Sequence, residues 1–100
     1  MNKEEIFTAA IQRYGPTAQE DMAIEEMSEL IQAILHNRRG RYSNIAEEIA
    51  DVEITLYQLK MIHRCKQKVA EYKNRKIVRL AKRLRMKGYY KGECLENEES

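Results

Sequence analysis

The chain has 100 residues, of which 43% are hydrophobic and 34% are charged, and its net charge is +2. This length suits a single domain with a modest core, and this composition excludes an intrinsically disordered chain. Because the sequence has only one Pro, four Gly and few β-branched residues, we expect an all-α protein.

The sequence shows no targeting or disulfide signal. No apolar run approaches the length that spans a membrane, and the N-terminal stretch MNKEEIFTAA lacks the apolar core of a signal peptide. Cys65 and Cys94 lie far apart, outside the spacing of a zinc site. We therefore expect a cytoplasmic protein with two reduced thiols and no membrane partner.

Charge is distributed unevenly along the chain. Residues 1–60 carry six Lys/Arg against eleven Asp/Glu, whereas residues 61–100 carry twelve against five. An acidic first part suits a metal ion. A basic second part suits an anion, which includes nucleic acid.

The first two helices are separated by a strong break. Helical spacing of apolar residues predicts a first helix over about Lys3–Arg13, and Gly15 with Pro16 ends it. Thr17, with Glu20 three residues later, has the pattern of a capping box. The second helix is therefore expected from Thr17 to about residue 37.

The same signals predict two further helices. Gly40 suits the exit from the second helix, and Asn44 with Glu47 repeats the capping pattern. A third helix is expected over about Ile45–His63 and a fourth over about Gln67–Lys87. Together they predict one domain over residues 1–92, a bundle of about four helices, followed by a flexible tail over residues 93–100.

Several carboxylates in the second helix lie beside its apolar side. At about 100° per residue, this helix presents one apolar arc, made of Ile24, Met27, Leu30, Ile31, Ile34 and Leu35. Glu26 and Glu29 lie next to that arc, whereas Glu25 points further outward.

The third helix repeats this arrangement. Its apolar stripe consists of Ile45, Ile49, Val52, Leu56, Leu59 and Ile62. Glu48 falls inside the stripe and Asp51 on its edge, whereas Glu47 and Glu53 point to the opposite flanks. If the two helices pack antiparallel, the acids of both helices converge.

Converging carboxylates repel one another and lose water, so they require a positive partner. Oxygen-only ligands suit Mg²⁺, with Mn²⁺ as a substitute. The alternatives are a solvated acidic face and a buried salt-bridge cluster with the basic fourth helix. A di-iron bundle is disfavoured, because neither His36 nor His63 follows a Glu by three residues.

The acids match a known pattern in order and spacing. The sequence EEMSE at residues 25–29 and the sequence EIAD at residues 48–51 resemble the EExxE and ExxD motifs of the MazG-like nucleotide pyrophosphohydrolases, an all-α family. The resemblance is strongest over Ala23–Leu59. It implies that the chain cleaves a nucleoside triphosphate into the monophosphate and pyrophosphate.

The resemblance also implies roles for individual residues. Glu26, Glu29, Glu48 and Asp51 would hold Mg²⁺, with Glu25 as a further ligand or a group that supports the ligands. Glu26 and Glu29 are the catalytic candidates, and Glu29 is our choice for the base that activates water.

The fourth helix resembles the segment that binds substrate in this family. Asn74, Lys76 and Arg79 are the positions that the resemblance assigns to phosphate or ribose contacts. The family's arginine commonly falls one residue later, where this chain has Leu80, so Arg83 is the alternative to Arg79.

The resemblance also implies a homodimer or tetramer that associates through helix faces. Two other functions stay open at this point. One is a nucleic-acid-binding helical module that uses the basic segment 64–91, and the other is a catalytically silent MazG-like scaffold.

Overall fold

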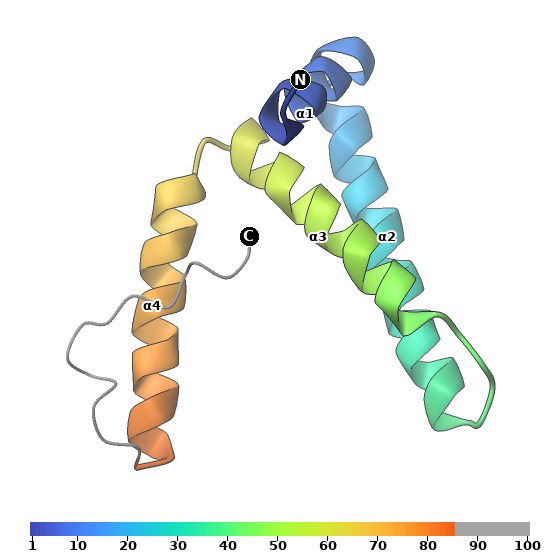
Figure 1. The fold of residues 1–100 in the computed structure, drawn as a ribbon, viewed down its shortest axis with the longest axis vertical. Helices are drawn as coiled ribbons and strands as arrows, with labels where there is room; N and C mark the ends of the chain where they lie inside the picture. The colour runs from blue at the N-terminus through green and yellow to red at the C-terminus, as the bar shows by residue number, and fades with distance from the viewer. Residues whose placement is uncertain (86–100) are drawn as a thin grey trace. The chain divides into compact units, whose positions relative to one another are not determined.

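The computed structural model describes residues 1–85. The expected tail over residues 93–100 and Cys94 lie outside the described residues, whereas the last helix ends at Arg83, earlier than the expected Lys87. Within residues 1–85 every regular element is a helix, which confirms the all-α prediction. In chain order the helices are α1 (Lys3–Tyr14), α2 (Pro16–Arg38), α3 (Ile45–Ile62) and α4 (Lys66–Arg83) (Figure 1).

The helices belong to two compact units. The first unit, Met1–Arg64, contains α1, α2 and α3, and the second unit begins at Cys65 and contains α4. The expected single domain over residues 1–92 stays a prediction, since the second unit extends beyond the described residues. None of the described helices has the length and apolar character needed to cross a membrane.

Helix α1 begins with a capping box that our sequence interpretation missed. The side chain of Asn2 accepts a hydrogen bond from the backbone N–H of Glu5 at 2.8 Å, and the backbone N–H of Asn2 donates to Glu5 Oε1 at 3.1 Å. Both bonds satisfy amide groups that the first helical turn leaves unpaired. The spacing of Asn2 and Glu5 is that of a capping box, so this cap could have been predicted from the sequence.

The start of α2 differs from our prediction. The expected cap at Thr17 is wrong, because the helix already begins at Pro16 and its N-cap is Gly15, with no side-chain cap. Proline suits the first helical position, where the missing N–H has no partner to lose. Gly15 has φ +93°, a value that side-chain-bearing residues rarely adopt, and its N–H donates to the carbonyl of Ile11 at 2.8 Å.

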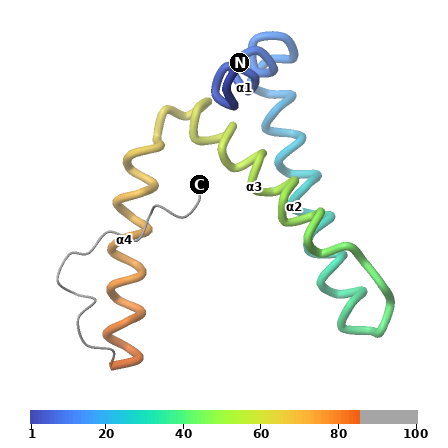
Figure 2. The backbone as a smooth tube through the Cα atoms, in the orientation of Figure 1, coloured from blue at the N-terminus to red at the C-terminus, as the bar shows by residue number. Residues whose placement is uncertain are grey.

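A short connection joins α2 to α3 and reverses the chain (Figure 2). Gly40 adopts φ +80° as expected for the exit from α2. Asn37 Oδ1 accepts a hydrogen bond from the backbone N–H of Ser43 at 2.9 Å, which closes the connection. The side chain of Asn44 accepts from the backbone N–H of Glu47 at 3.2 Å, so the predicted cap of α3 is confirmed.

Helices α2 and α3 pack along each other through small and polar residues. The buried residues of this seam are Gln19, Ala23 and Ala33 on α2, and Val52, Thr55 and Gln58 on α3. The buried hydroxyl of Thr55 donates to the carbonyl of Val52 at 2.8 Å and is therefore satisfied. Small side chains let two helices approach closely, which explains why the seam does not follow the predicted apolar stripes.

Two flanks therefore border the seam. The buried residues of α2 lie along one line on the helix surface. At about 100° per residue, Glu29 lies on one side of this line, and Met27 and Ile31 lie on the other. We call Glu26, Glu29, Glu48 and Asp51 the acidic flank. We call the large apolar side chains on the opposite side, all of them exposed, the apolar flank: Ile24, Met27, Ile31, Ile34, Ile49 and Leu56.

Helix α1 packs against both other helices of the first unit. The rings of Phe7 and Tyr57 lie 5.3 Å apart at 56°, and the Tyr57 hydroxyl donates to Glu4 Oε2 at 3.0 Å. His63 Nε2 lies 2.7 Å from Glu20 Oε2, which connects the end of α3 to the first turns of α2. These contacts lie at the end of the α2–α3 pair opposite the connecting loop. They join α1 to α3, and the end of α3 to the start of α2.

Candidate metal centre

Three carboxylates converge across the two packed helices. Glu26 and Glu29 lie about one turn apart on α2, and Glu48 lies in the first turns of α3. One carboxylate oxygen from each of the three residues lies within 4.8 Å of the others. The convergence predicted for these three acids is therefore seen in the structure.

Asp51 lies near this group without belonging to it. It is half-buried, and its negative charge contributes to raising the pKa of both Glu26 and Glu48. Glu25, in contrast, is exposed and lines a separate pocket. The structure thus groups three of the five predicted ligands, brings Asp51 within electrostatic reach and directs Glu25 elsewhere.

Burial and mutual repulsion act together on the protonation of these acids. Burial is the main cause that raises the pKa of Glu26 above its ordinary value of 4.5, and the charge of Glu29 adds to it. The pKa of Glu48 is raised for the same two reasons in the same order. Both carboxyl groups therefore hold their protons to a higher pH than an ordinary Glu does, and a positive charge beside them would favour the ionised form.

Two oxygen atoms of the group are buried without a hydrogen-bond partner. They are Glu26 Oε1 and Glu48 Oε1, each fully shielded within the described part of the chain. An unpartnered buried carboxylate oxygen is costly, so the fold retains an unfavourable feature on both helices at one place. A cation bound between the helices would satisfy both oxygens at once.

The salt-bridge alternative involves α4, which belongs to the other unit, so it stays untested. Over residues 1–64 the acids of this group form no ion pair, and the pair found there joins His63 to Glu20. The donor set is made only of carboxylate oxygens, which is the chemistry preferred by hard cations such as Mg²⁺ and Mn²⁺. The residues present therefore fit the expected metal.

The predicted substrate-binding residues all lie on α4. Lys76, Arg79 and Arg83 are exposed there, and Asn74 is half-buried. They belong to a different compact unit from the acids, so their role in substrate binding stays a prediction.

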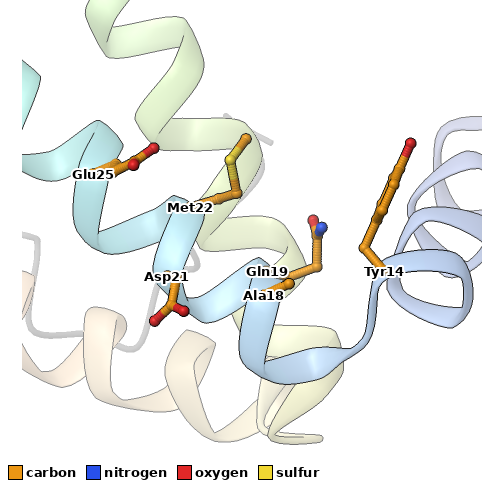
Figure 3. A pocket seen from close by; sticks show the side chains of 6 residues that line it. All are labelled: Tyr14, Ala18, Gln19, Asp21, Met22 and Glu25. Carbon is orange, nitrogen blue, oxygen red and sulfur yellow. The ribbon is translucent and has the colours of Figure 1, made fainter.

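Our sequence interpretation missed a pocket at the junction of α1 and α2. It has a volume of about 490 Å³ and is lined by Tyr14, Ala18, Gln19, Asp21, Met22 and Glu25 (Figure 3). The signal that would have indicated it is Met22, a large apolar residue that lies outside the predicted apolar arc. A second hollow, of about 390 Å³, lies on the outer side of α1 and involves none of the acids of the group.

Comparisons with known proteins add no relative. No protein-family model, curated protein or solved structure matches the chain. What the site does must therefore be inferred from its own residues. A group of carboxylates, two of them half-buried with raised pKa values, is a donor set that could hold a metal ion.

Proposed function

We propose that the chain is a Mg²⁺-dependent nucleoside triphosphate pyrophosphohydrolase of the MazG-like kind, which converts a (d)NTP into the (d)NMP and pyrophosphate. The observation that carries this proposal is the pair of buried, unpartnered oxygens of Glu26 and Glu48. They occur in the three-carboxylate group, at positions that match the EExxE and ExxD motifs. A solvated acidic face would not leave such atoms buried.

The acids would have different roles, and the burial of each side chain suggests which role it has. Glu26 and Glu48 supply the buried oxygens and are the ligands that a cation satisfies best. Asp51 completes the ligand set from α3. Bound Mg²⁺ would neutralise phosphate oxygens and acidify an attacking water.

Glu29 remains our choice for the general base. Its side chain is exposed, so water and substrate reach it more readily than they reach Glu26 or Glu48. Its ligand oxygen lies within 4.8 Å of those of both neighbours, which keeps it beside the bound cation. A carboxylate in this position can orient the attacking water and accept its proton.

Basic side chains of α4 would bind the substrate's phosphates. Lys76 and Arg79 are exposed cations at positions that match the family's basic segment, and Asn74 would contact phosphate or ribose. Replacing Lys76 by Gln should raise KM for the triphosphate more than it lowers kcat, because a phosphate contact acts mainly on binding.

The same proposal includes association of identical chains. The apolar flank exposes large side chains, with Ile24 at 61% and Ile31 at 58% of their full accessible area. Folded monomers rarely expose a contiguous apolar surface of this kind. A second copy, placed with its own apolar flank against the first, would cover it symmetrically.

The decisive experiment supplies the full chain with a panel of dNTPs and NTPs in Mg²⁺, with EDTA as the control. We expect monophosphate and pyrophosphate in equal amounts, and no turnover in EDTA. Hydrolysis in H₂¹⁸O places the label in the monophosphate if water attacks the α-phosphorus. Release of inorganic phosphate, or no consumption of any triphosphate, would overturn the proposal.

A second function is favoured by one observation on α4. Apart from Glu71, the charged residues of this helix are Lys and Arg, and all of these are exposed. A nucleic-acid-binding role predicts salt-sensitive binding to DNA or RNA that persists when Glu48 is replaced. Binding of this type without hydrolysis of any triphosphate would favour the second function over the first.

A further inference from the structure

We propose that the pocket lined by Tyr14, Gln19, Met22 and Glu25 binds the nucleobase of the substrate. In this proposal Glu25 accepts a hydrogen bond from an exocyclic amino group of the base and does not bind the metal. The proposal rests on the proposed function in one respect, because that function places the phosphates of the same substrate at the acidic flank.

The pocket lies on the same side of α2 as the acids. Counted at about 100° per residue, Met22 and Glu25 project within about one quarter-turn of Glu29, away from the apolar flank. Glu25 lines the pocket and is followed directly by Glu26, which belongs to the three-carboxylate group. One continuous surface of the helix therefore joins the pocket to the acids.

The spacing along α2 suits one extended ligand. From Gln19 to Glu26 the helix rises by about 10 Å, at 1.5 Å per residue. This separation is comparable with that between the base and the phosphates of a nucleotide. A ligand with its phosphates at the three-carboxylate group would thus reach the pocket with its base.

The lining residues suit a flat, polar-edged ring. Figure 3 shows the Tyr14 ring at the end of α1 and the Gln19 amide to its left, both side chains pointing to the same side of the ribbon. Tyr14 is 63% exposed, so a ring face is available for stacking, and the Met22 side chain supplies apolar contact. Stacking of a base on an aromatic side chain does not depend on which base it is.

Selectivity between bases would come from the carboxylate of Glu25 and the amide of Gln19. A carboxylate only accepts hydrogen bonds, whereas the Gln19 amide both donates and accepts. Cytosine, adenine and guanine carry an exocyclic amino group that donates to a carboxylate. At the position of the cytosine amino group, uracil and thymine present a carbonyl oxygen, which a carboxylate repels, and their remaining donor on that edge is the ring N3–H.

Kinetics of the full chain distinguish this role from metal binding. In Glu25→Gln, we expect KM for dCTP, dATP or dGTP to rise about tenfold, as loss of a hydrogen bond to a charged group predicts. KM for dTTP should fall or stay the same, because Gln removes the charge that repels its carbonyl oxygen, and the Mg²⁺ concentration for half-maximal rate should stay unchanged. An increased Mg²⁺ requirement with unaltered base preference would overturn the proposal.

Two further variants control this experiment. Tyr14→Ala should raise KM for every triphosphate by about tenfold, because stacking on an aromatic ring strengthens binding whatever the base. Glu53→Gln removes an exposed carboxylate from α3, away from the pocket, and should leave both KM and base preference as in the unchanged chain.

A binding measurement separates failure of this proposal from failure of the proposed function. NMR spectra of the metal-free chain are recorded with dCMP, dAMP, dGMP and dTMP at millimolar concentration. Shifts at Tyr14, Gln19 and Glu25 with the amino-bearing nucleotides, weaker with dTMP, support the base pocket even if no triphosphate is hydrolysed. No shift at these residues with any of the four nucleotides would overturn it, even if hydrolysis is observed.

Discussion

The two flanks of the α2–α3 pair differ in how their side chains are exposed to solvent. On the acidic flank, carboxylate oxygens of Glu26 and Glu48 are buried without a partner. On the apolar flank, large side chains such as Ile31 are exposed to solvent. Burial without a partner supports the proposed cation, whereas exposure of apolar surface supports the proposed second copy of the chain. The two proposals therefore concern different flanks of one helix pair.

The largest effect should follow a change on the acidic flank. Glu48→Gln should lower triphosphate hydrolysis by roughly 100-fold or more, because metal chemistry supplies several kcal/mol of the catalysis. Steady-state rates in Mg²⁺ measure this, with Glu53→Gln on the same helix as control. An active Glu48→Gln variant would remove this residue from the proposed ligands.

The same substitution tests whether the acidic flank is built for a cation. Gln keeps the shape of the side chain and removes a charge that the site disfavours. Thermal unfolding of the metal-free variant at pH 7 should therefore occur at an equal or higher temperature than that of the unchanged chain. A much lower temperature would mean that lost activity reflects misfolding.

On the apolar flank, a charge should separate the proposed copies. Ile31→Glu is expected to weaken self-association by about 100-fold or more, since an interface would bury an unpaired carboxylate. Light scattering over a range of protein concentrations measures this. Ile54→Glu is the matched control, because Ile54 is also exposed but projects from the opposite side of α3. Equal effects of both variants, or a monomer at all concentrations, would contradict the assignment.

The pH dependence of stability should distinguish metal-free from metal-bound protein. Glu26 and Glu48 have raised pKa values in the folded chain, so the folded state keeps protons that the unfolded state has lost above about pH 4.5. Their contribution to stability therefore falls as pH rises through the raised pKa values. Metal-free protein should melt at a higher temperature at pH 5 than at pH 7.

Added Mg²⁺ should flatten or reverse this slope, because a cation favours the ionised carboxylates. Scanning calorimetry at several pH values, with and without Mg²⁺, provides the measurement. The double variant Glu26→Gln with Glu48→Gln should lose both the slope and its response to Mg²⁺. A slope that is unchanged in the double variant must arise from other groups.

The smallest effect is expected outside both flanks. Asn44→Ala removes the side-chain acceptor for the Glu47 amide and should lower stability by about 1 kcal/mol. The unfolding midpoint in urea measures this loss. Asn44→Gly should lose only a few tenths of a kcal/mol, which separates the cap from general effects of shortening the side chain.

Much of the fold could be predicted from the sequence, because its signals are local. The break at Gly15 and Pro16, the exit at Gly40 and the cap at Asn44 each depend on the preferences of one or two residues. The grouping of Glu26, Glu29 and Glu48 followed from helical phase once the two helices were taken as antiparallel. In each case neighbours along the chain, or one helix turn apart, decide the outcome.

The rest depended on how the helices meet. The predicted stripe through Ile49 and Leu56 is exposed, while Thr55 and Gln58 are buried. Apolar periodicity identifies a face that avoids water. It does not identify which partner covers that face, and a second helix packs closest against small residues. The pocket beside Tyr14 was missed for a related reason, because it forms only where two helices join.

Gly15 joins the helix that carries the Tyr14 ring to the helix that carries Glu26 and Glu29. Tyr14 belongs to α1, whereas the four residues of the acidic flank belong to α2 and α3. A change in the length of α1, or in the backbone at Gly15, would move the ring of Tyr14 relative to Gln19 without displacing the carboxylates of that flank. Under the two proposals, the stacking surface for the base and the metal ligands could therefore change independently, because they belong to different helices.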